Sequence, residues 1–264
     1  MHPFPIDLYA YHNRLRTTHP AEKILFAGIT ILICLVASSP VVALLALAFV
    51  TVAVVGVAGI PLRAFWYFVR LPAGFIVLGV LTLAIMSVDP ADAATLFALP
   101  VGPWHLGATW SGLERAAQVA SVSFACVASM LSLALTTPMV DITDQLRKWR
   151  VPQLFIELMV LMYRFIFVFI ETAQAMYIAQ NARLGYSNWR RSLRSAGMLA
   201  ANLYLRSQAR AAALFTALTA RGYTGELRVL TAQPTWSPRN LLVIAGAESV
   251  LLLAAIATWW WRIL

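Results

Sequence analysis

Charged residues are scarce in this chain: 12% of its 264 residues are Asp, Glu, Lys or Arg, whereas 61% are hydrophobic. A soluble globular domain has about 25% charged residues, so composition excludes that class and predicts a polytopic membrane protein. Cysteine is nearly absent as well. Cys34 and Cys126 lie in apolar runs without a Cys or His at ligand spacing. They are therefore interpreted as small core residues rather than a disulfide or a zinc site.

Other absences exclude particular binding sites. The sequence contains no G-x-x-x-x-G-K-[ST] loop, so it has no ATP site of that kind. The histidines have no partner His, Cys or carboxylate at a convincing ligand spacing, and we expect this chain to bind no metal; they are His2, His12, His19 and His105. The formal charge of +9 does not require a nucleic-acid partner, because the cytoplasmic loops of membrane proteins are rich in Lys and Arg. No nucleic-acid partner is expected.

Long apolar runs predict an all-α integral membrane protein with about five transmembrane helices. The run 24–60 is too long for one span of about 20 residues, and Pro40 divides it. Segment 59–72 places Arg63 and Arg70 beside aromatic residues, as expected of a segment that lies at a membrane interface. The predicted spans are about 24–38, 41–59, 73–88, 115–136 and 240–261.

Most basic residues lie between the fourth and the last span. This block predicts helices at about 138–149, 152–183 and 188–221, the last two long and crossing. Segment 154–177 is apolar enough to imitate a span, but Glu157, Arg164 and Glu171 recur on one stripe, which an ordinary span avoids. With five spans and the N-terminus inside, the block is cytoplasmic and the C-terminus outside. The predicted regions are 1–136 (N-terminal segment and spans one to four), 137–239 (cytoplasmic-side coupling helices) and 240–264 (last span).

Two helices of this block end in similar cationic tips. Their sequences are Ala182-Arg183-Leu184 and Ala220-Arg221-Gly222. An arginine followed by glycine is also an ordinary way to end a helix, but the repetition suggests a paired contact device, and the planar five-donor fork of Arg suits carbonyls and carboxylates of a partner. Before each tip, alanines three or four apart line one helix face, and small faces let two helices cross closely; the plainer explanation is that Ala is a good helix former. These alanines are Ala175, Ala179 and Ala182, and Ala209, Ala213, Ala217 and Ala220.

Three motifs, HPAEK (19–23), AQNARLGY (179–186) and TARGYTGE (219–226), resemble those of the transmembrane (T) subunit of energy-coupling factor (ECF) transporters. The order of spans and the basic block match too, and the chain is most similar to the CbiQ-like branch of cobalt importers, with nickel importers close behind. The second tip fits the family pattern Ala-Arg-Gly fully. The first departs from it, since Leu184 occupies the third place and Gly185 follows.

The resemblance implies a non-catalytic subunit of a prokaryotic inner-membrane importer. Two ABC-type ATPases would each hold one tip, Ala182-Arg183-Leu184 or Ala220-Arg221-Gly222, and would bind the ATP and Mg, so that this chain needs no cofactor. The apolar surface of the coupling helices would cradle a substrate-binding membrane (S) subunit for cobalt or nickel, and a small accessory membrane subunit is compatible with this assembly.

Two other classes stay open. A self-contained secondary transporter requires midplane charges, broken helices or an inverted repeat, and the spans offer only Glu248. That carboxyl group would serve either as a structural hydrogen-bonding group or as a relay. A membrane enzyme would use Asp141 and Asp144, but no His or Lys joins them, and an acidic first helical turn is the simpler interpretation.

Overall fold

The computed structural model describes residues 5–84, 86–87, 95–101, 104–223 and 236–263. Within them, six helices are long and apolar enough to cross a membrane, which confirms an all-α membrane protein. Five of the six coincide with the expected spans, and the sixth is the apolar helix that contains Glu157, Arg164 and Glu171. The chain divides into two compact units, a first unit of Ile6–Pro138 with Gln233–Leu264 and a second unit of Met139–Ala232 with Met1–Pro5.

The first unit contains all five predicted spans. Ser38 adopts a left-handed conformation (φ 44°) and Pro40 begins the next helix, so the expected division of the apolar run at Pro40 is confirmed. Its helices are α1 (Pro5–Tyr11), the 3₁₀ turn η1 (Arg14–Thr17), α2 (Pro20–Ala37), α3 (Pro40–Thr51), the π-helical η2 (Val52–Val57), α4 (Leu62–Ala84), α5 (Trp110–Thr136) and α9 (Pro238–Ile263).

The third span, expected at about 73–88, differs at both ends, because α4 covers Leu62–Ala84. The interface segment 59–72 and this span are not separate, because α4 runs without interruption through Pro72. Proline removes one backbone donor from a helix. Transmembrane helices tolerate this, because neighbouring helices and local adjustments satisfy the freed carbonyl.

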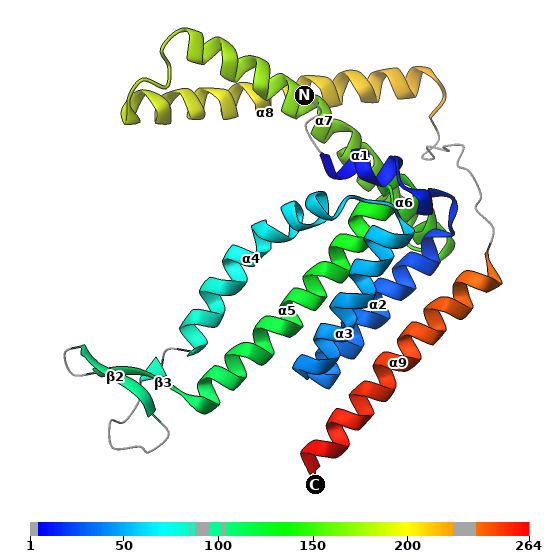
Figure 1. Cartoon of the computed structure of the whole chain (residues 1–264). Helices are drawn as coiled ribbons and strands as arrows, with labels where there is room; N and C mark the ends of the chain where they lie inside the picture. Colours follow the sequence, from blue (N-terminus) through cyan, green and yellow to red (C-terminus); the bar gives the residue numbers. More distant parts are fainter. Residues whose placement is uncertain (1–4, 85, 88–94, 102–103, 224–235, 264) are drawn as a thin grey trace. The chain divides into compact units, whose positions relative to one another are not determined.

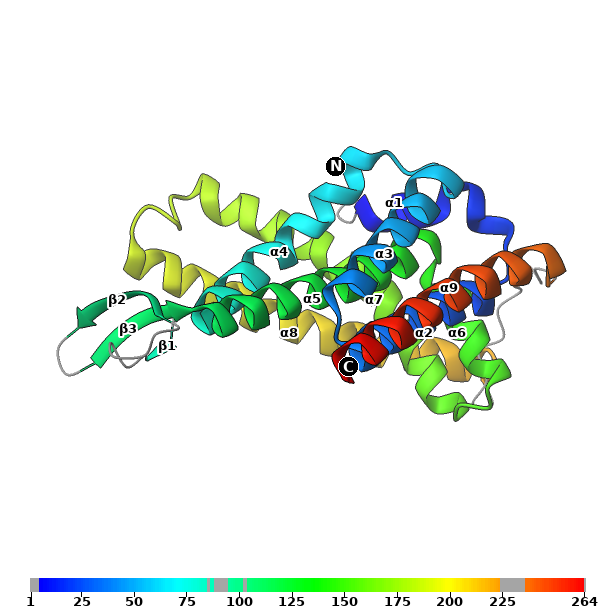
Figure 2. The ribbon, with the colours of Figure 1, turned by 60° about the horizontal axis from the view of Figure 1, so that its bottom comes forward.

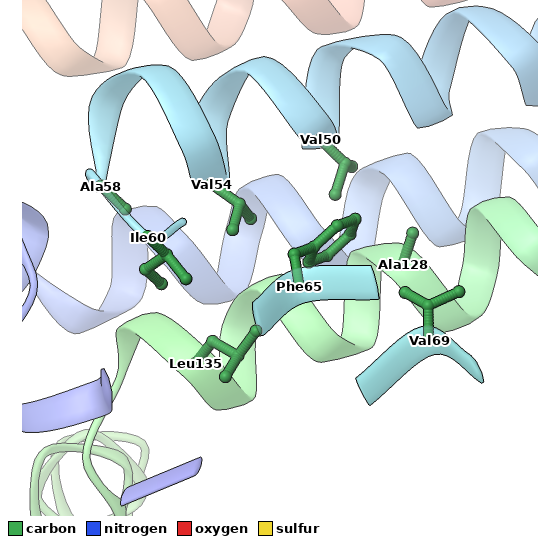
Figure 3. Close-up of a cluster of buried hydrophobic side chains, with 8 residues drawn as sticks. All are labelled: Val50, Val54, Ala58, Ile60, Phe65, Val69, Ala128 and Leu135. Carbon is green, nitrogen blue, oxygen red and sulfur yellow. The ribbon is translucent and has the colours of Figure 1, made fainter. Parts of the chain in front are cut away.

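Helix α5 is the centre of the first unit, since it packs against α2, α3 and α4, while α9 packs against α2 and α3 (Figures 1 and 2). One apolar cluster joins α3, η2, α4 and α5, and in it the ring of Phe65 lies between Val50, Val54 and Ala128 (Figure 3). Full burial of such a side chain contributes roughly 1.5–3 kcal/mol. A second cluster joins α2, α3, α5 and α9 and comprises Ile33, Cys34, Val42, Ala43, Ala46, Ala125 and Leu251.

A small antiparallel sheet, which the sequence pattern did not predict, precedes α5. Strands β1 (Met86–Ser87), β2 (Thr95–Val101) and β3 (Trp104–Thr109) are arranged in the order β1-β3-β2. Pro100 within β2 is incompatible with a helix interior, and the extended chain satisfies its backbone groups by pairing with β3. Thr109 then caps α5, because its hydroxyl accepts a hydrogen bond from the Gly112 N–H at 3.1 Å.

The second unit is a helical block. It comprises α6 (Met139–Lys148), α7 (Gln153–Ala182) and α8 (Trp189–Ala220), each within one residue of the predicted bounds. Helix α6 packs against α7, and α8 returns past α7 after the turn that joins them (Figure 1). The two long helices bury little: Ile156 and Glu157 are the buried residues of α7, and Ser195 is that of α8. Arg228 of the basic block lies outside the described residues.

Candidate functional site

The two cationic tips have the same backbone geometry. Arg183 is the C-cap of α7 with φ −93° and ψ 17°, and Arg221 is the C-cap of α8 with φ −94° and ψ 9°. The residue after each arginine is left-handed, with φ 59° at Leu184 and 75° at Gly222. Leucine in the third place of the first motif therefore does not alter the path of the chain.

Both helix ends are closed by Schellman hydrogen bonds. At the first tip, the Gly185 N–H donates to the Gln180 carbonyl at 2.9 Å, and the Leu184 N–H donates to that of Asn181 at 3.0 Å. At the second tip the equivalent bonds are Tyr223 N–H to Leu218 O and Gly222 N–H to Thr219 O, both 3.0 Å. The same motif thus presents an arginine at the end of each long helix.

Both arginines are exposed, and among the described residues neither guanidinium forms a hydrogen bond or an ion pair. A cation at the negative end of a helix dipole is favourable there. The tips lie at opposite ends of α8, because Arg183 precedes its start and Arg221 follows its last residue. With 32 residues in α8 and a rise of 1.5 Å per residue, the separation along that helix is about 48 Å.

The first tip is bound to α8 by a compact polar network. The Ser195 hydroxyl donates to the Gly185 carbonyl at 2.9 Å, and Gln180 Nε2 donates to the Ser195 carbonyl at 3.1 Å. Tyr186 Oη donates to Gln180 Oε1 at 2.7 Å. Gly185 has no room for a side chain, since a Cβ atom would lie 2.7 Å from Ser195 Oγ and 2.8 Å from the Gln180 carbonyl oxygen.

The second tip is bound to the first turns of α7. Tyr223 Oη donates to Glu157 Oε2 at 2.6 Å, and Gln153 Nε2 donates to Glu157 Oε1 at 3.1 Å. The hydrogen bond to Glu157 raises the pKa of Tyr223 above its ordinary value of 10.0, as expected for a phenol that donates to a carboxylate. Sequence reasoning placed Glu157 on a charged stripe but missed this contact. The signal that could have indicated such contacts is a tyrosine shortly after each arginine: Tyr186 follows Arg183 by three residues, and Tyr223 follows Arg221 by two.

The alanine ladders lie on exposed surface of α7 and α8. All seven alanines are exposed, and the close crossing through these faces stays a prediction; they are Ala175, Ala179, Ala182, Ala209, Ala213, Ala217 and Ala220. The hydrogen bonds that tie the two helices lie near their ends instead, where Gln180 meets Ser195 and where Glu157 accepts from Tyr223 just after α8.

The HPAEK motif connects the start of α2 to α9 and to the end of α5 within the first unit. His19 Nδ1 accepts from the Ala21 N–H at 3.2 Å and stacks on Trp236 with ring centroids 4.3 Å apart. The buried Glu22 carboxylate accepts from the Ser237 N–H at 3.0 Å and from Asn240 at 3.2 Å. A carboxylate suits the positive start of α9. Lys23 Nζ donates to the Thr136 carbonyl at 2.9 Å, at the end of α5.

The remaining candidate residues have structural partners. The buried Glu248 accepts from the Thr30 hydroxyl at 2.7 Å through Oε1, which favours the structural alternative over a relay. Asp141 lies in the first turn of α6, and Asp144 pairs with Arg147 at 3.5 Å. Within the described parts of the chain, no group of three or more His, Cys, Asp or Glu is placed to hold a metal ion.

The class that these features define is a multi-pass helical membrane protein with two matched cationic helix ends. Its family follows from comparison with known sequences: residues 12–231 match the family CbiQ, described as cobalt transport protein, and the chain belongs to that family. The CbiQ-like resemblance is thereby confirmed.

Three relatives illustrate the match. A cobalt transport protein CbiQ of Rhodobacter capsulatus is 37% identical over 95% of this chain and 97% of its own length. A second protein of that name, from Salmonella typhimurium, is 30% identical over 60% of this chain and 70% of its own length. A protein of Methanocorpusculum labreanum named as a fused cobalt transport protein, CbiMQ, is 32% identical over 83% of this chain, which covers 36% of the fused protein.

Proposed function

We propose that this chain is the transmembrane coupling (T) component of an ECF-type ABC importer for cobalt. In this proposal it transmits the motion of two ATPase subunits to a substrate-binding membrane subunit. The observation that carries the proposal is the pair of tips, in which one Schellman geometry exposes Arg183 and Arg221 at the C-terminal ends of two long helices. Two equal contacts about 48 Å apart along α8 suit two copies of one partner.

Exposed apolar surface on α7 supports the second half of the proposal. Leu154, Phe155 and Met162 are 66%, 60% and 63% exposed, and contiguous apolar surface of this kind is typical of interfaces with proteins or lipid. This face is the proposed cradle for the S subunit. The relative named as a fused cobalt transport protein supports association of such chains with another transport subunit. Cobalt is the proposed ion because the named relatives are cobalt transport proteins.

The remaining parts of the proposal concern chemistry and orientation. The chain is non-catalytic and binds no cofactor, and the partner ATPases bind ATP and Mg. It lies in the inner membrane of a prokaryotic cell, with the N-terminus and the α6–α8 block cytoplasmic and the C-terminus outside. The basic residues of the block, including Arg190, Arg191 and Arg194, support this orientation through the positive-inside tendency.

The test replaces the two tip arginines. A desolvated charge-assisted contact contributes roughly 1.5–3 kcal/mol, so Arg183→Ala or Arg221→Ala weakens recovery of the ATPases, and the double variant releases them or uncouples hydrolysis from uptake. Arg→Lys is harmful too, since an ammonium group cannot reproduce the planar fork. The measurements are ATPase copurification in gentle detergent and cobalt uptake per ATP hydrolysed, with nickel uptake in parallel.

Arg190→Ala is the matched control, because Arg190 is an exposed arginine of the same unit that lies in the first turn of α8 rather than at a C-terminal end. It retains assembly and uptake. A double tip variant that assembles and transports like wild type refutes the proposal. Equal damage from Arg190→Ala would mean that diffuse charge, rather than the tips, makes the contact.

A further inference from the structure

We propose that Glu157 is a positioning residue for transport: by holding Tyr223 it fixes the second tip to the start of α7, so that displacement of Arg221 moves α7 as well as α8. This inference rests on the proposed function, since it supposes that the tip is the point at which force is applied.

The geometry makes the link short and stiff. Tyr223 lies two residues after Arg221, and its own N–H closes the Schellman motif on the Leu218 carbonyl at 3.0 Å. Backbone and side chain of Tyr223 are therefore fixed together. Its hydroxyl contacts Glu157 Oε2 at 2.6 Å, within the short range of a hydrogen bond to a charged oxygen.

Glu157 is itself held in place. The residue is 6% exposed, and its other carboxylate oxygen accepts from Gln153, one turn earlier in α7. A buried carboxylate with both oxygens engaged has little freedom to follow the tip by rotation. Motion of the tip is therefore passed to the helix rather than absorbed by the side chain.

The first tip has the reciprocal arrangement. It lies at the end of α7 and is tied to α8 by the Ser195 hydroxyl on the Gly185 carbonyl and by Gln180 on the Ser195 carbonyl. Each tip is thus attached to its own helix by the backbone and to the opposite helix by side chains. Neither tip can move alone, and the pair responds as one body.

The first experiment measures the tie without any ATPase. Pulsed EPR distances are recorded on the full chain in nanodiscs, after Cys34→Ala and Cys126→Ala, with spin labels at the exposed positions 155 and 216. The wild-type tie gives one narrow distribution. Tyr223→Phe, which removes only the hydroxyl, shifts the ratio of tied to untied forms by roughly fivefold and broadens the distribution.

A matched label pair at the exposed positions 181 and 196 reports the other end of the two helices and stays unchanged in Tyr223→Phe. Glu157→Ala reproduces the broadening. Glu157→Gln, which keeps an acceptor oxygen, restores most of the narrow distribution. Wild-type distances in both Tyr223→Phe and Glu157→Ala would overturn the tie.

The second experiment uses the assembled transporter. Tyr223→Phe leaves ATPase recovery at the wild-type level, because Arg183 and Arg221 are intact, but cobalt uptake per ATP falls several-fold. Glu157→Gln, in which Tyr223 keeps its hydroxyl and an acceptor oxygen, retains most of the wild-type uptake per ATP. Unchanged uptake per ATP in a variant with broadened distances overturns the positioning role. Failure of the proposed function gives a different result, because the double arginine variant would then still copurify with its partners. The EPR distances test the hydrogen bond between Tyr223 and Glu157 independently of that outcome.

Discussion

Gly185→Ala tests the compact end of the second unit. A Cβ atom at this position would lie 2.7 Å from Ser195 Oγ and 2.8 Å from the Gln180 carbonyl oxygen, both closer than carbon and oxygen can approach without movement. Ser195 is buried and donates to the Gly185 carbonyl, and the Gln180 carbonyl is the acceptor that closes the Schellman motif. Relief of the clash therefore breaks one of these bonds. The expected cost is about 1–3 kcal/mol, as for overpacking in a filled site.

The assay is amide hydrogen exchange of segment 180–195, because the damage is local. A cost of that size accelerates exchange at Leu184 and Gly185 by roughly 5- to 150-fold, since 1.4 kcal/mol corresponds to a factor of ten. Gly197→Ala is the control. A Cβ atom there meets nothing within 4 Å, and alanine is the better helix former, so exchange is unchanged or slower. If the segment exchanged in Gly185→Ala as in wild type, the tight contact with Ser195 would be refuted.

Two further predictions follow from backbone strain and from a buried carboxyl group. Leu184→Gly removes the penalty of a left-handed leucine whose side chain is 67% exposed, and should protect the same amides from exchange by about 1 kcal/mol more. The control is Leu193→Gly, at a leucine that is 64% exposed inside α8, and it should destabilise that helix by about 1 kcal/mol. Equal losses of stability in both variants would contradict the strain argument. Thr30→Val removes the donor to buried Glu248 and should lower the free energy of unfolding in detergent by roughly 1–3 kcal/mol, whereas Thr30→Ser, which keeps the hydroxyl, should unfold like wild type.

The helices were predictable because each has a local cause. The length of the apolar runs predicted the spans, and Pro40 predicted the break between α2 and α3. Both tip motifs end their helices at the expected arginines. The small sheet was missed because its strands are short, and because the pairing of β2 with β3 leaves no periodic pattern of hydrophobic residues in the sequence. Continuity of α4 through Pro72 was missed because a membrane helix tolerates what a soluble helix does not.

The candidate site was predictable only in part. Arg183 and Arg221 are visible in the sequence because the tip motif occurs twice, but spacing did not reveal which residues hold the tips. Tyr223 and Glu157 are 66 positions apart, and no local pattern connects them. The alanine ladders are also visible in the sequence. A helix face rich in alanine permits close packing but does not require it, and in this chain by itself those faces are exposed.

The distribution of buried polar contacts suggests which unit is built to move. In the first unit, buried Glu22, Thr30 and Glu248 fix α2 to α9, and Lys23 fixes α2 to α5. Breaking any of these leaves a buried polar group without its partner, so this bundle resists rearrangement. In the second unit, α7 and α8 bury few side chains and meet through hydrogen bonds near their ends. Segments with few buried apolar contacts change conformation at low cost. Between the ties at its two ends, the α7–α8 pair therefore resists deformation less than the bundle of the first unit does.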